Sequence, residues 1–251
     1  MIYASHLLKD EDMKKLADQY EIGIETIEFS IAENLDSLDE KIKEYKERIR
    51  NMGFHRLTVH GPFLDLNPAA FDSRVREITM YRFQQAYHAA QELQAEKIIF
   101  HTGFIPKLYY LEGWSQRVAG FFNEFMEGRE GMPVLMENVY DPEPEHVIKV
   151  KELVQSPDFN LCLDVGHAHC YSEKSLKTWI EQGGKYVKHL HIHNNDGTWD
   201  NHKGVNGGNL PLKDLRLWIS QNIKDATATI ECSDIGDIAG WYKELKSWNL
   251  F

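Results

Sequence analysis

The sequence of 251 residues contains no long run of apolar residues. A helix that crosses a bilayer needs roughly 18 or more consecutive apolar residues, and no stretch approaches that length. The opening residues, MIYASHLLKDEDM, also lack the basic segment and the continuous apolar segment of a secretion signal. We therefore expect no membrane partner and no export.

Cysteine is scarce, and its placement argues against two further classes of protein. The three cysteines, Cys162, Cys170 and Cys232, form no C-x-x-C pair. This count and spacing indicate neither a disulfide framework nor a thiolate zinc site. The sequence predicts a reduced, cytoplasmic protein.

Positive charge is also in short supply. Lys and Arg total 28 against 39 Asp and Glu, which gives a net charge of −11. The densest basic run, KIKEYKERIR at 41–50, is interleaved with glutamate and is typical of a solvated helix face. Because phosphate backbones are bound mainly through Lys and Arg, the composition argues against a nucleic-acid partner. A small-molecule substrate is favoured, and homo-oligomerisation is left open.

The chain alternates short β-branched apolar runs with longer segments of helical spacing. Leu38, Ile42, Tyr45 and Ile49 show that spacing on one helix face, and Ser37 with Glu40 predicts a capping box at its start. The predicted strands are Ile2–Ala4, Ile22–Phe29, Leu57–His60, Lys97–His101, Val134–Asn138, Leu161–Asp164, Val187–His193 and Ala226–Glu231.

Eight strand–helix units in a chain of this length favour a closed barrel over an open sheet. No glycine-rich phosphate fingerprint follows the first strand, which argues against a dinucleotide-binding fold. No linker or low-complexity segment divides the chain. We predict an α/β fold, a (β/α)₈ TIM barrel formed as one domain by residues 1–251.

Six of the eight predicted strands end in a residue that can bind a divalent cation. In a parallel barrel these ends open on one face, where active sites of this fold lie. Burying so many ionisable groups near one axis without a cation would cost too much free energy. The six residues are His60, His101, Glu137, Asp164, His191 and Glu231.

Two turns add further ligands to this face. His167 follows Asp164 in the stretch DVGH, and Asp200 and His202 lie in the histidine-rich stretch HLHIHNNDGTWDNH. Imidazole and carboxylate donors without thiolate suit Zn²⁺, Mn²⁺ or Co²⁺. The sequence therefore predicts a site for one to three ions, zinc or manganese, with nine candidate ligands.

These motifs resemble the xylose isomerase-like TIM barrels over positions 57–232. The matching stretches are VHGPF, HTG, ENV, DVGHAH, HLHIHNNDG with DNH, and IEC. That superfamily contains sugar and sugar-phosphate isomerases and epimerases, and also zinc-dependent apurinic-site endonucleases. The resemblance implies one metal ion held by Glu137, Asp164, His191 and Glu231, as in the epimerases. All nine candidates correspond to the ligands of three zinc ions in the endonucleases.

Two departures from the family pattern leave the substrate open. The epimerases carry an arginine shortly after the histidine of the seventh strand, whereas His191 is followed by IHNNDG. Relatives often have G-x-G with an acidic middle residue where this chain has Asn206-Gly-Gly-Asn209. Fold-level analogy alone does not assign a substrate.

Two reactions suit this set of residues. In a metal-dependent sugar isomerase or epimerase, Glu137 and Glu231 would exchange a substrate proton as base and acid, and His167 would bind a substrate oxygen. In a multinuclear phosphoester hydrolase, clustered cations would clamp phosphate oxygens. The acidic composition favours the first reaction, and the full set of nine ligands favours the second. A barrel that binds metal or sugar without turnover is the third alternative.

Four residues are candidates for substrate contact: Phe63, Tyr140 and Trp199 as stacking walls, and His193 at the mouth of the barrel. Plain packing is the competing interpretation for the aromatic residues. His189 is expected to be a core imidazole. Glu28, near the end of the second strand, would either reach the pocket or form a surface ion pair.

Overall fold

The computed structural model describes all residues, 1–251, and contains eight parallel strands paired in chain order. The first strand also pairs with the last, which closes the sheet into a barrel. The strands are β1 (Ile2–Ser5), β2 (Gly23–Thr26), β3 (Leu57–His60), β4 (Ile98–His101), β5 (Val134–Glu137), β6 (Phe159–Asp164), β7 (Val187–Ile192) and β8 (Thr227–Ile230). The predicted (β/α)₈ barrel is confirmed.

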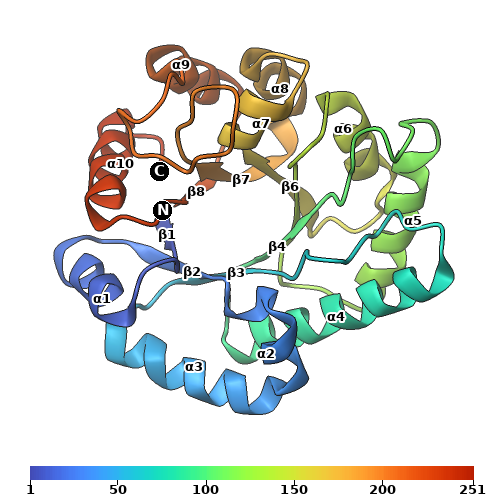
Figure 1. The fold of residues 1–251 in the computed structure, drawn as a ribbon, viewed down its shortest axis with the longest axis horizontal. Helices are drawn as coiled ribbons and strands as arrows, with labels where there is room; N and C mark the ends of the chain where they lie inside the picture. Colours follow the sequence, from blue (N-terminus) through green and yellow to red (C-terminus); the bar gives the residue numbers. More distant parts are fainter.

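The helices surround this ring of strands (Figure 1). Eight follow the strands as the outer layer: α1 (Asp10–Gln19), α3 (Leu38–Met52), α4 (Ser73–Glu92), α5 (Trp114–Met126), α6 (Pro144–Leu153), α8 (Leu176–Gly183), α9 (Leu212–Asn222) and α10 (Ile235–Trp248). Four short elements were not predicted: α2 (Ala32–Asp36), α7 (Val165–Tyr171) and the 3₁₀ turns η1 (Glu28–Ser30) and η2 (Gly184–Tyr186). None of the helices is both long and apolar enough to cross a membrane.

The predicted second strand, Ile22–Phe29, was too long. It ends at Thr26, and η1 begins two residues later. The Thr26 hydroxyl accepts a hydrogen bond from the backbone N–H of Glu28 at 3.0 Å, which starts the turn. The other seven strands match their predicted bounds to within two residues at each end.

The predicted capping box of α3 was also wrong. Ser37 is the residue before the helix, but its side chain makes no capping hydrogen bond. Its backbone has φ −116° and ψ 42°, outside the extended conformation from which a hydroxyl reaches the first amides of a helix. Side-chain caps are present instead at α4, α7, α8 and α10, from Asp72, Asp164, Ser175 and Asp234.

The hydrophobic core lies between the strands and the outer helices and contains 61 buried residues. Its densest part is aromatic and is centred on Phe83 of α4. The ring of Phe83 stacks on Phe100 of β4 at 3.9 Å between centroids and meets Phe121 and Phe125 of α5 edge-on. This packing fixes α4 and α5 against β4, the strand that carries His101.

The inside of the barrel is divided between apolar and polar residues. Ile99, Leu135 and Cys162 form a small buried apolar cluster on neighbouring strands β4, β5 and β6. On the remaining strands the inward positions include Glu25 and Thr58, both completely buried. Barrels of this kind are usually filled with bulky branched side chains. A completely buried carboxylate such as Glu25 is therefore unusual inside the barrel, and its role has to be sought in the residues that it contacts.

Phe83→Ala should lower the free energy of unfolding by about 3–5 kcal/mol, because it removes a buried ring from close-packed neighbours. Phe71→Ala is the matched control, since the Phe71 side chain is 77% exposed, and it should cost less than about 1 kcal/mol. Denaturant titration of both variants tests this. Equal losses in the two variants would contradict the packing described here.

Candidate metal centre

The predicted strand-end ligands gather at the carboxyl ends of the strands. His60, His101, Glu137 and Asp164 are the last residues of β3, β4, β5 and β6. His191 lies within β7 beside Asp164, and Glu231 follows β8 directly. The ordered pairing of a parallel barrel thus brings six residues from positions 60 to 231 to one face.

Glu137 lies at the centre of this group and is 1% exposed. Its Oε2 atom is 3.4 Å from Nε2 of His60, 3.6 Å from Nε2 of His101 and 3.2 Å from Nδ1 of His191. Its Oε1 atom is 3.3 Å from Nδ1 of His167. One carboxylate therefore contacts four imidazole rings from four different elements.

His191 joins Glu137 to the far side of the barrel. Nδ1 of His191 lies 3.2 Å from Oε2 of Glu137 and 3.2 Å from Oε1 of Glu231. Asp164 lies beside this group, where its Oδ1 accepts a hydrogen bond from the backbone N–H of His167 at 2.7 Å. Asn138 donates to the Asp164 carbonyl and accepts from its N–H, which holds the end of β6 in place.

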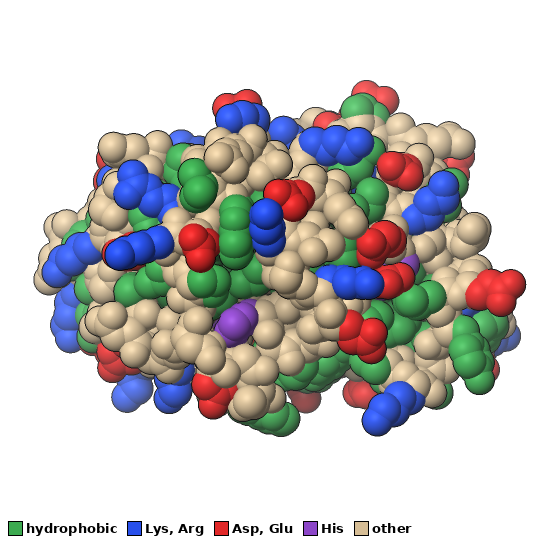
Figure 2. All heavy atoms as spheres, turned by 90° about the horizontal axis from the view of Figure 1, so that it is seen from above, with side chains coloured by type: hydrophobic (Ala, Val, Ile, Leu, Met, Phe, Trp, Pro, Cys, Tyr) green, Lys and Arg blue, Asp and Glu red, His purple; other side chains and the backbone are tan.

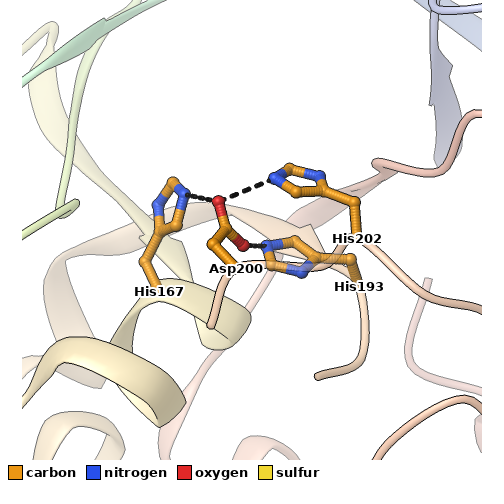
Figure 3. Close-up of side chains that lie close together, drawn as sticks. All are labelled: His167, His193, Asp200 and His202. Carbon is orange, nitrogen blue, oxygen red and sulfur yellow. Dashed lines mark hydrogen bonds and ion pairs between the residues drawn. The ribbon is translucent and has the colours of Figure 1, made fainter. Parts of the chain in front are cut away.

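A second group of donors surrounds Asp200 in the loop after β7 (Figure 3). Oδ2 of Asp200 is 3.2 Å from Nε2 of His167 and 2.9 Å from Nε2 of His202. Its Oδ1 is 3.5 Å from Nε2 of His193. One donor atom from each of these four residues lies within 4.8 Å of the others, a spacing that would hold a metal ion.

The hydrogen bonds of three histidines set which ring nitrogen faces the site. Nδ1 of His60, His167 and His202 lies 2.9–3.0 Å from the carbonyl oxygen of Gly61, Asn138 and Glu231 respectively. A carbonyl oxygen only accepts, so Nδ1 carries a hydrogen in each ring. Nε2 is therefore the nitrogen that faces the site, and in His167 and His202 it lies 3.2 Å and 2.9 Å from Oδ2 of Asp200.

Several buried donor atoms have no hydrogen-bond partner at all. They are Oε2 of Glu137, Oδ2 of Asp164, Oδ1 of Asp200 and both ring nitrogens of His191, among others. Carboxylate oxygens and imidazole nitrogens that face one another at about 3 Å repel unless a hydrogen or a metal cation lies between them. The chemistry of this donor set, nitrogen and oxygen without thiolate, fits Zn²⁺ or Mn²⁺.

Burial and charge shift the pKa values of the site residues in different directions. Burial lowers the pKa of His101 to about 3, so its ring is neutral. Burial also opposes a charge on His202, but its hydrogen bond with Asp200 raises its pKa to about 9. For Glu137, burial favours the neutral acid, but the neighbouring histidines, His191 foremost, outweigh burial and hold the pKa well below its usual value.

The site opens into a cavity of about 600 Å³. Seven of the nine predicted ligands line it: His60, His101, Glu137, His167, Asp200, His202 and Glu231. Asp164 and His191 are completely buried beneath them. The structure therefore brings all nine residues together, with two in a deeper layer than the others.

The four predicted substrate contacts lie in different surroundings. Phe63 stacks on His101 at 4.4 Å between ring centroids, and both Phe63 and Tyr140 line the cavity. His193 is completely buried and stacks on His202 at 3.9 Å. Trp199 is 66% exposed and is not part of the cavity lining.

The residue that sequence reasoning missed is Glu25 on β2. Glu28 was considered as the carboxylate from this part of the chain, but its side chain forms an ion pair with Arg48 at 2.8 Å. Glu25 is completely buried instead, and its Oε1 atom lies 3.0 Å from Nε2 of His191. The alternation in Ile24-Glu25-Thr26 placed Glu25 on the inner face and was the available signal.

Comparison with known proteins gives relatives of matching length and architecture. An uncharacterised protein of Methanocaldococcus jannaschii is 27% identical over 229 residues, which cover 87% of this chain and 78% of the relative. A D-tagatose 3-epimerase-like protein has a TM-score of 0.83 at 24% identity, with 99% of this chain and 96% of that chain covered. A Thermus thermophilus protein, from a crystal soaked with ZnCl₂, has a TM-score of 0.78 at 23% identity and 98% coverage of both chains.

A D-psicose 3-epimerase from Clostridium cellulolyticum, solved with D-tagatose, shares the fold at a TM-score of 0.71 and 17% identity, over 98% of this chain and 94% of that chain. At the level of sequence, the family model described as xylose isomerase-like TIM barrel matches residues 16–248. With that match and the closed barrel, the chain belongs to the family of xylose isomerase-like TIM barrels.

Proposed function

We propose that this protein is a divalent-metal-dependent isomerase or epimerase of a small, uncharged carbohydrate. The observation that carries the proposal is the placement of Glu137 and Glu231. Both line the cavity, and both lie 3.2 Å from the same atom, Nδ1 of His191. They arrive from β5 and β8, on different sides of the barrel, so a substrate between them meets a carboxyl group on each side.

A divalent cation held by Glu137, Asp164, His191 and Glu231 would polarise the substrate carbonyl and acidify the neighbouring C–H. One glutamate then takes the proton from carbon, and the C–H electron pair moves into the carbonyl group. The other glutamate, carrying a proton, returns it to carbon on the opposite face. One carboxyl gains a proton and the other loses one, so the reaction is redox-neutral.

The cavity lining favours an uncharged substrate. No lysine lines it, and its single arginine, Arg82, is paired with Asp36 at 2.7 Å. A phosphate group would therefore find no free cationic side chain there. Proteins of the same fold include one named D-tagatose 3-epimerase-like and others named 3-epimerases of D-psicose and L-ribulose, which supports a ketose as the substrate class.

A multinuclear phosphoester hydrolase is the second candidate, and one observation favours it. Two donor groups flank the central one: His60 with His101, and His167 with Asp200 and His202. If the protein binds a single ion at the central group, neither of these flanking groups coordinates a metal. Under the isomerase proposal these side chains bind substrate hydroxyls.

A polymeric nucleic-acid substrate fits the surface poorly. The face in Figure 2 intersperses Lys and Arg with Asp and Glu and shows no continuous basic track. The net charge of −11 also disfavours binding of a polyanionic substrate. The hydrolase candidate is therefore restricted to a small phosphorylated molecule.

Exchange of the substrate C–H with solvent tests the two glutamates. With D-psicose or D-tagatose in D₂O, the wild-type protein should incorporate deuterium at carbon, measured by NMR. Glu137→Gln and Glu231→Gln should each lower the rate by about 10²–10⁴-fold, because each removes a proton carrier. Glu33→Gln is the control, since Glu33 lines the cavity away from the cluster, and a similar loss in that variant would count against the assigned roles.

The number of bound ions separates the two candidates. Elemental analysis should find one zinc or manganese ion per chain, and the double variant Asp200→Asn, His202→Gln should keep isomerase or epimerase activity at a reduced level. Two or three ions per chain, with loss of bis(p-nitrophenyl) phosphate hydrolysis in the double variant, would instead establish the hydrolase.

Divalent-ion affinity should rise with pH, about tenfold per unit between pH 6 and pH 8. Burial opposes a charge on the His191 ring, but the nearby Cys162, Glu137 and Glu231 raise its pKa well above the usual value. Cys162 is a neutral thiol, with its pKa raised to about 12, so the carboxylates carry this effect. The metal-free ring is therefore protonated at pH 7, and binding through Nδ1 releases that proton.

Isothermal titration in buffers of different ionisation enthalpy measures the proton release directly. A binding constant unchanged from pH 6 to pH 8, with no proton released, would show that His191 is not a ligand.

A further inference from the structure

Beneath the candidate metal centre, a continuous chain of polar side chains runs along the inside of the barrel. It begins at Lys97, just before β4, and passes through Thr227, His189 and Thr229 to Glu25. All five residues are buried or nearly so. The proposed reaction uses none of them directly, and a buried polar chain is weak evidence for stability on its own.

The direction of each hydrogen bond in the chain follows from its neighbours. Thr58 and Thr229 both donate to Oε2 of Glu25 at 2.8 Å. Since the single hydroxyl hydrogen of Thr229 is used there, its oxygen accepts from Nε2 of His189 at 2.8 Å. Glu25 is therefore a carboxylate that only accepts.

The rest of the chain fits the same direction. Nε2 of His189 carries the hydrogen that is donated to Thr229, so Nδ1 of this ring is left as an acceptor. Nδ1 accepts from the hydroxyl of Thr227, whose oxygen in turn accepts from the ammonium of Lys97 at 2.7 Å. Each residue from Lys97 to Thr229 thus donates a hydrogen bond to the next one in the direction of Glu25. The positive charge of Lys97 balances the negative charge of the carboxylate.

The remaining oxygen of Glu25 faces His191. Oε1 of Glu25 lies 3.0 Å from Nε2 of His191, and neither atom has a hydrogen-bond partner elsewhere. A hydrogen on Nε2 satisfies this oxygen, and in a neutral ring it leaves the lone pair on Nδ1. That lone pair then faces Glu137 and Glu231, the two carboxylates of the proposed ion site.

We propose that Glu25 is a positioning residue that orients His191 for metal binding, with its hydrogen fixed on Nε2 and Nδ1 presented to the ion. The inference rests on the proposed function, since it takes His191 as a ligand. Carboxylates that accept from the second nitrogen of a ligating histidine fix its tautomer and orientation. Here Thr58, Thr229 and the chain from Lys97 hold that carboxylate charged inside the barrel.

The test compares Glu25→Gln with Glu28→Gln, a matched change three residues away whose glutamate pairs with Arg48 outside the barrel. Titration of the metal-free proteins with ZnCl₂ should show affinity weakened about 10–100-fold for Glu25→Gln and within about twofold of wild type for Glu28→Gln. Thr58→Val, which removes one donor to Glu25, should weaken affinity by a smaller factor and serves if Glu25→Gln does not fold.

A second readout follows the ring hydrogen itself. In ¹⁵N-histidine-labelled protein, NMR should find hydrogen on Nε2 of His191 with and without zinc, and should find that preference lost or mixed in the zinc-loaded Glu25→Gln. Wild-type affinity and an unchanged Nε2 hydrogen in a folded Glu25→Gln protein would overturn the inference, as would equal losses of affinity in both glutamine variants.

A failure of the inference about Glu25 can be distinguished from a failure of the proposed function. A wild-type protein that binds no divalent ion contradicts the metal-dependent reaction. A metal-free wild-type protein whose His191 ring lacks hydrogen on Nε2 would still overturn the inference, because such a ring could not donate to Glu25.

Discussion

The carboxylate of Glu137, held among the rings of four histidines at the mouth of the barrel, is the interaction on which the site depends. A buried carboxylate is stable only when positive charge or hydrogen donors offset its loss of hydration. Of the surrounding rings, His60 has its Nδ1 hydrogen directed at a backbone carbonyl, and His101 is neutral. In the metal-free protein the ring of His191, whose pKa is raised, faces this carboxylate at 3.2 Å and supplies positive charge. A divalent cation bound as proposed would take over that role.

The fold explains how residues from positions 25 to 231 share one small volume. Parallel strands in chain order bring all eight carboxyl ends to one face. Side-chain alternation then stacks His189 and His191 along the inner face of β7. The barrel thus has a polar axis with two layers, the open one at Glu137 and the closed one at Glu25.

Much of this arrangement could be predicted from the sequence because it depends on periodicity. Apolar runs that end in His60, His101, Glu137 and Asp164 indicated both the barrel and the face that carries the site. The candidate ligands Asp200 and His202 in the loop followed from the histidine-rich stretch after β7. Family membership agreed with the motifs that suggested it.

The remainder depends on turns and tertiary contacts that a local pattern does not specify. The 3₁₀ turn at Glu28–Ser30 ends β2 earlier than predicted, so Glu28 does not lie on the strand. The buried glutamate is Glu25, and its contacts with Thr58, Thr229 and His191 come from distant strands. Ser37 failed as a cap for a similar reason, because its backbone conformation is set by the preceding helix α2 as well as by its own residue type.

Anomalous scattering from crystals grown with zinc or manganese tests the central claim most directly. A shared cation requires a peak at about 2.0–2.2 Å from carboxylate oxygens of Glu137, Asp164 and Glu231 and from Nδ1 of His191. A folded protein whose crystals show no peak among these four side chains, at saturating metal, would contradict it.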